Sequence, residues 1–286
     1  MQSAKVRKAT FAGSWYPSSA SECEREIRNY IESGAVSVPA GAKWTGGIVP
    51  HAGWFFSGSI ACNVIRYLKD EKSLDTVVVF GMHLNADSPC YMMAEGAWQT
   101  PFGDLMVDEE LAAELTGKFS FILETPDNFS QDNTIELQLP FIKYFFREAK
   151  VLAMGVPPHK RSLEIGRAVA EISKKTGRRI KVIGSTDLTH YGYNYGLVSK
   201  GTGEKAVQWV RNENDRRVIA AMLDMDPEKV IAEARANQNA CCAGAAATAI
   251  ETAKDLGVHS AAEIAYATSY DKSPGDSFVG YVGIVF

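Results

Sequence analysis

Three of the five histidines in this chain each follow a short run of apolar, mostly β-branched residues. They are His51 after 48–50, His83 after 76–80 and His190 after 180–184. Such runs are typical of strands buried on both faces of a sheet, so these histidines would lie beyond the carboxyl ends of the strands. Ligands bind at that edge of an open α/β sheet. Because imidazole binds transition metals and titrates near neutral pH, the pattern predicts a metal site or an acid–base site.

A single histidine after a strand is more often a partly buried structural residue than a ligand. Three of them at one edge, in a chain with only five, favour a functional site. His159 and His259 lie in connecting segments, and we expect both at the surface.

Two adjacent cysteines, Cys241 and Cys242, directly precede an alanine-rich segment with helical character. A thiol at a helix N-terminus is acidified by the helix dipole, and the thiolate is the form that binds metal or attacks carbonyl groups. The alternative is a pair of small buried apolar residues. Beside three histidines, one of these thiolates would complete a metal site.

The remaining cysteines, Cys23, Cys62 and Cys90, are predicted to be packing residues. Five cysteines cannot all pair, and a chain of this length does not need disulfide bonds, so a reducing compartment is expected.

Two acidic residues accompany the histidines. Asp187 precedes His190 by three residues and would either orient an imidazole by accepting its N–H or cap the turn after the strand. Glu136 is either a surface carboxylate of a helix or a residue of the pocket, and the sequence does not separate these two alternatives.

The segments that must position these residues alternate between helix and strand. The spacing of apolar residues predicts helices over 20–32, 56–69, 108–118, 134–149, 163–175, 204–223, 227–236 and 243–256, with Pro140 kinking or dividing the fourth. Strands are predicted over 46–50, 76–80, 151–156, 180–184, 262–268 and 278–286, and an irregular hairpin over the sheet edge at 90–107. This alternation predicts an α/β sandwich in which helices flank a central, largely parallel or mixed sheet. We expect one domain over 1–286.

Composition and motifs exclude several classes of protein. With 46% hydrophobic and 22% charged residues and a net charge of −4, the chain is of the globular type and gives no electrostatic reason to bind nucleic acid or anionic membranes. It has no signal-like N-terminus and no apolar run long enough to cross a membrane, so we expect a cytoplasmic protein. The fingerprints of P-loop, dinucleotide-binding, zincin and α/β-hydrolase enzymes are absent from the sequence.

An ordered set of motifs over nearly the whole chain resembles the MEMO family, also called AmmeMemoRadiSam system protein B. The motifs lie at 12–17 (AGSWYP), 49–53 (VPHAG), 81–83 (GMH), 134–141 (TIELQLPF), 185–191 (STDLTHY), 266–270 (YATSY) and 279–281 (VGY).

The resemblance implies a fold similar to that of the class III non-haem iron dioxygenases of the extradiol type. It also implies a metal site made of two histidines and a cysteine, which would be His51, His83 and Cys241 here. The metal would be iron or copper, with zinc as a further option. His190 would then occupy the position of a catalytic base, with Asp187 beside it. Cys242 stands where relatives have glycine, which leaves open which of the two cysteines is the ligand.

Two further positions depart from the family pattern. Asn133 stands where many relatives have a histidine, which removes a possible acid–base group. The turn before His83 is one residue shorter than the usual Gly-Pro-x-His.

Three functions follow from these residues. The leading hypothesis is a metal-binding protein with a redox-capable, dioxygenase-like pocket. The second is a non-enzymatic module that binds a peptide or phosphorylated ligand in the same pocket through aromatic residues, with Trp15, Tyr16, Trp54 and Phe55 as candidates. The third is a metal-free thiol hydrolase with Cys241 as nucleophile and His190 as base. The resemblance also suggests radical-SAM and AMMECR-type proteins as pathway partners.

Overall fold

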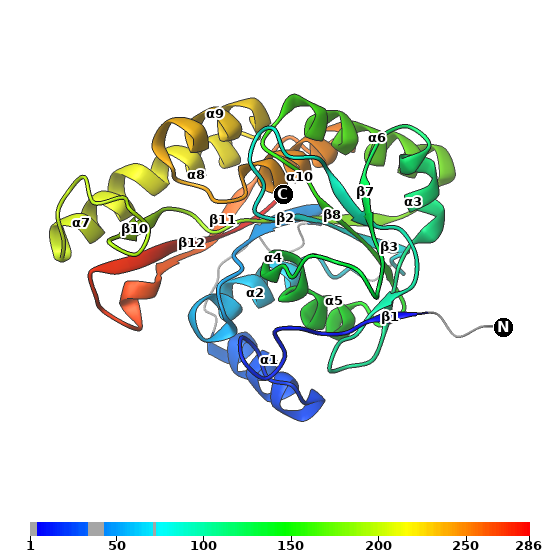
Figure 1. Ribbon diagram of the computed structural model, residues 1–286, viewed down its shortest axis with the longest axis horizontal. Helices are drawn as coiled ribbons and strands as arrows, with labels where there is room; N and C mark the ends of the chain where they lie inside the picture. Colours follow the sequence, from blue (N-terminus) through cyan, green and yellow to red (C-terminus); the bar gives the residue numbers. More distant parts are fainter. Residues whose placement is uncertain (1–4, 34–42, 71–72) are drawn as a thin grey trace.

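A nine-stranded mixed sheet runs through the middle of the molecule in the computed structural model, which describes residues 5–33, 43–70 and 73–286 (Figure 1). Its strands are β2 (Gly46–Val49), β3 (Thr76–Gly81), β4 (Tyr91–Met93), β7 (Ile122–Glu124), β8 (Lys150–Gly155), β9 (Ile180–Ser185), β10 (His190–Gly192), β11 (Ala262–Thr268) and β12 (Ser277–Val285). They are ordered β10-β12-β2-β9-β3-β8-β4-β7, and β11 pairs with β12. The four central strands β2, β9, β3 and β8 are parallel, so their carboxyl ends lie at one edge.

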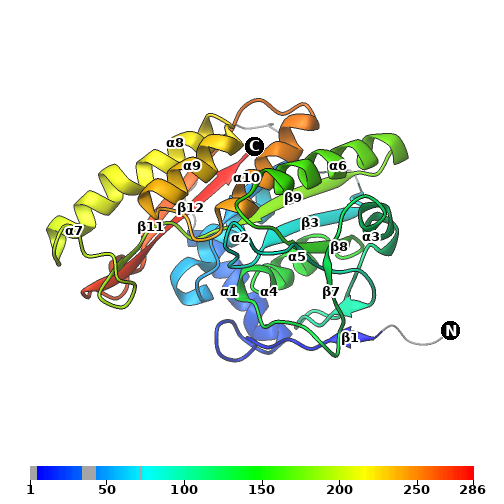
Figure 2. The same cartoon turned by 45° about the horizontal axis from the view of Figure 1, so that its top comes forward.

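Helices cover both faces of this sheet. The helices are α1 (Ala20–Ser33), α2 (Ser59–Tyr67), α3 (Glu109–Thr116), α4 (Asn133–Glu136), α5 (Leu139–Phe145), α6 (Lys160–Thr176), α7 (Glu204–Trp209), α8 (Asp215–Leu223), α9 (Pro227–Asn237) and α10 (Ala243–Asp255). Helices α6, α8, α9 and α10 lie on one side, and α1, α2, α4 and α5 on the other (Figures 1 and 2). Helix α10 packs directly against three of the central strands, β9, β3 and β2.

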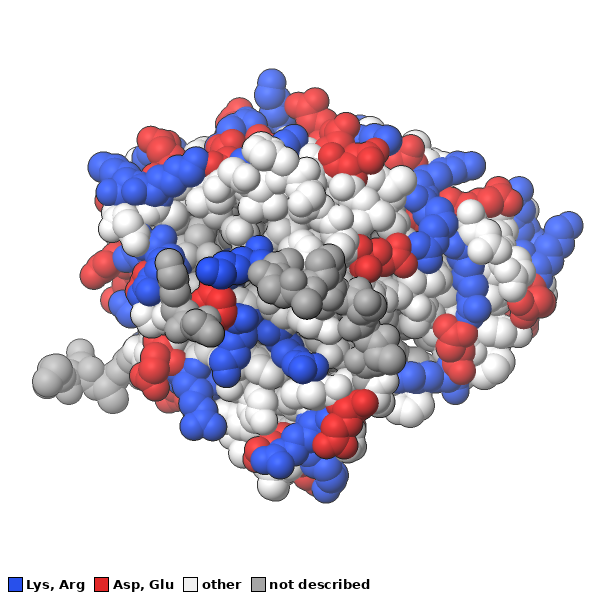
Figure 3. All heavy atoms as spheres, turned by 180° about the vertical axis from the view of Figure 1, so that it is seen from behind, with Lys and Arg blue, Asp and Glu red and all other residues white. Residues whose placement is uncertain are grey.

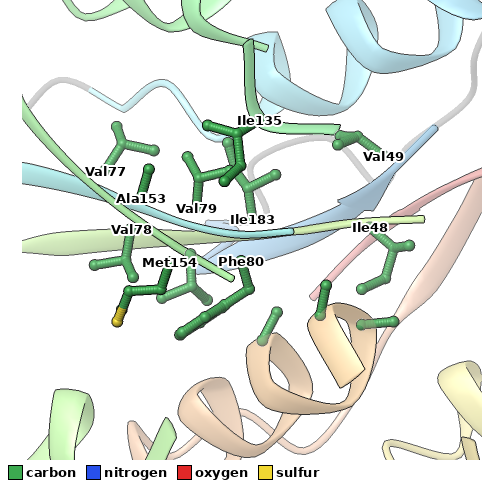
Figure 4. Close-up of a cluster of buried hydrophobic side chains, with 14 of the residues drawn as sticks. Ile48, Val49, Val77, Val78, Val79, Phe80, Ile135, Ala153, Met154 and Ile183 are labelled. Carbon is green, nitrogen blue, oxygen red and sulfur yellow. The ribbon is translucent and has the colours of Figure 1, made fainter. Parts of the chain in front are cut away.

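The central strands are apolar on both faces because both faces are covered. All six residues of β3 are buried. Figure 4 shows Val77 and Val79 on one side of the sheet and Val78 and Phe80 on the other, where the second pair faces α10. Strand geometry makes successive side chains alternate in this way, and a helical layer on each side removes both sets from water.

Glycines allow α10 to lie very close to the sheet. A Cβ at Gly184 of β9 would lie 2.8 Å from the carbonyl oxygen of Ala245. A Cβ at Gly244 would lie 2.4 Å from the carbonyl oxygen of Val156, just beyond β8. The first turn of α10 therefore packs backbone to backbone against the end of β8.

A small second sheet carries the N-terminal segment. It contains β1 (Val6–Arg7), β5 (Ala97–Trp98) and β6 (Leu105–Met106), in the order β1-β5-β6. The guanidinium of Arg7 is buried between the rings of Trp98 and Phe129, 4.0 and 3.9 Å from their centroids, and pairs with Glu124 at 2.7 Å.

The predicted α/β sandwich with a mixed sheet and flanking helices is confirmed. The predicted helix over 134–149 is divided into α4 and α5, and Pro140 lies in the first turn of α5. The predicted helix over 204–223 is interrupted by a π-helical segment, Val210–Asn214. Part of the predicted irregular hairpin belongs to the main sheet, because β4 pairs with β8, while β5 and β6 do form an antiparallel hairpin. The edge strand β7 was not predicted. Within the described residues, no helix has the length and apolar character needed to cross a membrane.

Candidate metal centre

Four potential metal ligands come together at the carboxyl edge of the central strands. His51 follows β2, His83 follows β3, and Cys241 and Cys242 directly precede α10. One ligand atom from each residue lies within 4.8 Å of those of the other three. The rings of His51 and His83 meet edge to face, with their centroids 4.9 Å apart. The structure thus brings together the three predicted metal ligands and places Cys242 with them.

Ser185, at the end of β9, sets the orientation and the tautomer of His51. Its hydroxyl donates to the carbonyl oxygen of Thr134 at 2.7 Å and lies 3.0 Å from His51 Nδ1. Because the single hydroxyl proton is used on Thr134, Ser185 accepts a hydrogen bond from Nδ1–H. His51 Nε2 faces Cys241 Sγ at 3.3 Å and is the nitrogen left for a metal ion.

A left-handed turn delivers His83 to the site. Met82 has a φ of 71°, a conformation that few non-glycine residues adopt, and its N–H donates to the Thr134 hydroxyl at 2.7 Å. The Met82 side chain occupies the space that a Cβ at Gly155 would need. Beyond this shortened turn, Nδ1 of His83 lies 3.8 Å from Oδ2 of Asp132.

The segment after β9 holds both cysteines. The N–H of Cys241 donates to the carbonyl oxygen of Asp187 at 3.1 Å, and that of Cys242 donates to the Thr186 hydroxyl at 3.0 Å. The two sulfur atoms are 3.7 Å apart. Cys242 is buried, whereas Cys241 is partly exposed. The sulfur of Cys241 lies 3.3 Å from Nε2 of His51, which supports Cys241 as the ligand of the predicted trio.

The electrostatics of the cluster favour a thiolate at Cys241. Burial opposes its ionisation, but hydrogen bonds from Cys242 and His51 and the charge of His51 lower its pKa well below the usual value. Burial and the neighbouring Cys241 sulfur raise the pKa of Cys242. The nearby Asp132 carboxylate and the Cys241 sulfur raise the pKa of His83 to about 10. For His51, burial acts against protonation, and the charges of Asp187 and Cys241 outweigh it and raise its pKa.

Asp187 contacts His51 rather than the ring of His190. Its Oδ1 accepts the backbone N–H of His51 at 2.7 Å, and its Oδ2 lies 3.8 Å from His51 Nε2. Burial raises the pKa of the Asp187 carboxyl. Nδ1 of His190 lies 3.1 Å from the carbonyl oxygen of Leu188, so the backbone orients this ring.

A cavity of about 610 Å³ lies over the cluster and includes His51, His83 and His190 in its wall. The rest of the lining consists of aromatic, hydroxyl and small residues, with Asn133 and Asp187: Ser14, Trp15, Ala52, Gly53, Phe55, Phe56, Asn133, Asp187, Tyr195, Ser269, Ser273, Ser277, Val279 and Tyr281. The ring of His190 meets that of Tyr195 edge to face, with centroids 4.9 Å apart.

The other two histidines, His159 and His259, are exposed, as predicted. His159 also caps α6 by accepting the N–H of Arg161.

The four candidate aromatic residues divide into two pairs. Trp15 and Phe55 are 42% and 65% exposed and line the cavity. Tyr16 and Trp54 are buried, and the Trp54 ring stacks on Phe141 with centroids 4.1 Å apart. Of the four candidates, Trp15 and Phe55 therefore remain as aromatic contacts for a ligand, beside Phe56, Tyr195 and Tyr281 of the cavity wall.

Glu136 fits neither of the two sequence alternatives. It is buried, and its carboxylate accepts the backbone N–H groups of Thr10 and Phe11 at 2.8 and 2.7 Å and the hydroxyl of Tyr16 at 3.1 Å. It therefore holds the N-terminal segment that carries Trp15 against the body of the protein.

Several supporting residues were not predicted. The side-chain amide of Asn133 donates to the carbonyl oxygen of His51 at 2.9 Å, and that of Gln138 donates to Pro50 at 3.0 Å. Ser185, Thr134 and Asp132 position the two histidines, as described above. Ser185 and Thr134 lie within the motifs 185–191 and 134–141, on which the family resemblance rests. Membership in these motifs was the sequence feature that could have pointed to their role.

The parallel strands, the flanking helices and a histidine–cysteine cluster at the carboxyl edge define an α/β protein with a candidate metal centre, as the resemblance to the extradiol-dioxygenase-like MEMO family implies. A family model described as a Memo-like protein matches residues 7–285. This chain therefore belongs to the Memo family.

Curated relatives agree with this assignment over their full length. MEMO1 family proteins of Pyrococcus furiosus and Thermococcus onnurineus are 33% and 32% identical to the chain, over 98% of it and 98% and 99% of their own lengths. The MEMO1 family protein of Pyrobaculum aerophilum is 30% identical, over 99% of both chains.

Proposed function

We propose that this protein binds one transition-metal ion at the cavity floor through His51, His83 and Cys241, and that it acts there as a dioxygenase-like oxidoreductase. The observation that carries the proposal is that these side chains, from three segments distant in sequence, have ligand atoms within 4.8 Å of one another. Two imidazoles and an acidic thiol are donors that suit iron, copper or zinc.

The donors fit a metal ion in both direction and charge. The hydrogen bond from His51 Nδ1 to Ser185 leaves Nε2 free, and the lowered pKa of Cys241 supplies a thiolate. Ligand histidines in metalloproteins are usually fixed through their second nitrogen in this way. When bound, iron or copper would supply redox chemistry and Lewis acidity at the cavity floor.

The other cavity residues would bind a small substrate and move a proton. Trp15 and Phe55 offer apolar surface to a ligand at the wall. The Nδ1–H of His190 is engaged by the carbonyl of Leu188, which leaves Nε2 to accept a proton from a substrate. Asp187 would act through His51, whose backbone it holds.

Charge argues against the phospho-ligand alternative. Among the described residues, the cavity lining contains no lysine or arginine, and phosphate recognition usually depends on such cations. The thiol-hydrolase alternative placed Cys241 with His190, but the histidine beside the Cys241 sulfur is His51.

Metal analysis of protein purified anaerobically under reducing conditions tests the proposal. We expect about one iron or copper ion, or zinc in their place, per chain. His51→Ala should lose the metal, whereas His259→Ala, which changes an exposed histidine, should retain it. His190→Ala should also retain the metal. Metal-free wild-type protein, or full retention in His51→Ala, would refute the proposal.

The five cysteines all lie within the described residues and are free thiols. This supports the further proposal of a cytoplasmic, reducing environment. A role beside radical-SAM and AMMECR-type partners stays a prediction from the family resemblance.

A further inference from the structure

We propose that Cys242 is a fourth metal ligand, so that the site of this chain offers two nitrogens and two sulfurs. The inference rests on the metal-binding function proposed above and adds a donor to it. The trio of His51, His83 and Cys241 leaves Cys242 without a role, although its sulfur belongs to the same 4.8 Å cluster.

The spacing of the donors matches a tetrahedral ion. With Zn–S bonds of about 2.3 Å and Zn–N bonds of about 2.0–2.1 Å, tetrahedral angles separate two sulfurs by about 3.8 Å and a sulfur from a nitrogen by about 3.6 Å. The sulfurs of Cys241 and Cys242 are 3.7 Å apart, and Cys241 Sγ is 3.3 Å from His51 Nε2. Two edges of the tetrahedron are therefore already close to their required lengths.

The backbone explains how two adjacent residues face one point. In a strand, successive side chains point to opposite sides. At Cys242 the chain enters α10 with φ −125° and ψ 52°, and the Thr186 hydroxyl accepts its N–H at 3.0 Å. The close packing of Gly244 on the end of β8 fixes the same turn. The second sulfur is thus held in place by the fold.

The second thiolate narrows the choice of metal. A tetrahedral set of two imidazoles and two thiolates suits zinc, and thiolates select copper(I), whereas non-haem iron oxygenases use three donors and keep open positions. We therefore infer zinc or copper(I) as the ion that engages all four side chains. Because all four donors bind in their deprotonated form, binding releases to solvent the thiol proton of Cys242 and every proton that the two imidazoles carry on their ligand nitrogens, and it involves no change in oxidation state.

Closure of the tetrahedron has a consequence for the cavity. Four protein donors leave no open position on the ion, so a substrate can reach it only if one donor dissociates. His83 is the most exposed of the four, with 46% of its side chain accessible, and it lines the cavity. It is the donor that a substrate would displace.

X-ray absorption spectroscopy of the zinc-loaded full-length chain, and cobalt(II) titration of the same protein, test the sulfur count. We expect two sulfur neighbours in wild type and one in Cys242→Ser. The near-ultraviolet sulfur-to-cobalt absorbance should fall by half in Cys242→Ser, and its zinc dissociation constant should rise by more than about tenfold. Cys90→Ser, which changes a buried thiol outside the cluster, is the matched control and should behave as wild type.

The outcomes separate this inference from the proposed function. One sulfur neighbour in zinc-loaded wild type, or unchanged cobalt absorbance in Cys242→Ser, would overturn the role of Cys242 and leave the three-donor site standing. Failure of wild type to bind any metal would refute both. If Cys242→Ser does not fold, the sulfur count in wild type still decides.

Discussion

At the scale of single residues, the site depends on where individual protons go. The Ser185 hydroxyl has one proton, and the carbonyl of Thr134 takes it, so His51 must donate from Nδ1. Nothing in the identity of His51 dictates which of its nitrogens faces Cys241. The hydroxyl of Ser185, more than 130 positions away along the chain, determines that Nε2 is the nitrogen that faces Cys241.

Ser185→Ala should therefore weaken metal binding while leaving all proposed ligands in place. Loss of a hydrogen bond that orients a ligand histidine typically costs about 10–100-fold in metal affinity, and we expect a loss in that range. Competition titration with a chromophoric chelator measures it. Ser173→Ala, at a buried serine of α6, should leave the affinity unchanged. Equal affinities in the two variants would contradict the role of Ser185.

At the scale of elements, the position of α10 decides where the cysteines lie. Its first turn touches the backbone after β8 through Gly244, where an added Cβ would meet the Val156 and Pro157 backbone at 2.4 Å. Backbone cannot yield as a flexible side-chain end can, so the helix itself must shift. The cysteines that precede it would move with it.

Gly244→Ala should reduce both stability and metal affinity. Overpacking of a well-packed core costs about 1–3 kcal/mol, which exceeds the roughly 1 kcal/mol that alanine gains over glycine in a helix. Urea unfolding and metal titration measure the two effects. Gly275→Ala is the control, because nothing lies within 4 Å of its added Cβ. Unchanged metal affinity in Gly244→Ala would show that the cysteines do not depend on this packing.

The sequence predicted the long elements and the ends that carry the histidines, because buried strands such as 76–80 have an unmistakable apolar pattern. It did not predict β1, β7 or β10, since two or three residues have no measurable periodicity, whereas β5 and β6 lie within the hairpin predicted over 90–107. Glu136 was undecidable for another reason. Its partners, the backbone of Thr10 and Phe11, lie more than 120 positions away, and backbone donors have no sequence signature.

At the scale of the whole molecule, charge is spread rather than concentrated. On the face shown in Figure 3, basic and acidic side chains are interspersed. Some acidic side chains, by contrast, lie in the interior of the protein. Asp215 of α8 is fully buried and accepts hydrogen bonds from the N–H and hydroxyl of Thr189 and from the hydroxyl of Tyr266 of β11 at 2.7 Å. Its hydrogen bonds therefore connect α8 to β11 and to the segment before β10.

This carboxyl should make stability depend on pH. Burial raises its pKa from 3.8 to about 6, so the folded state keeps the proton over a range in which the unfolded chain has lost it. Stability from this group is therefore fully present below pH 4 and falls as the pH rises to about 6, by up to about 3 kcal/mol. Urea unfolding of metal-free wild type and Asp215→Asn measures the difference. Wild type should lose more unfolding free energy than the variant between pH 4 and 7, and parallel pH profiles would contradict this.

The wide separation of the donors along the chain has a thermodynamic consequence. His51 and Cys241 are 190 positions apart, and a donor set of this kind exists only once the central strands and α10 have assembled. An ion bound there is linked to the global folding equilibrium, because the unfolded chain offers no comparable chelate. At a free metal concentration 1,000 times the dissociation constant, that linkage stabilises the native state by about 4 kcal/mol. Metal supply would then set the abundance of the folded protein as well as the occupancy of its site.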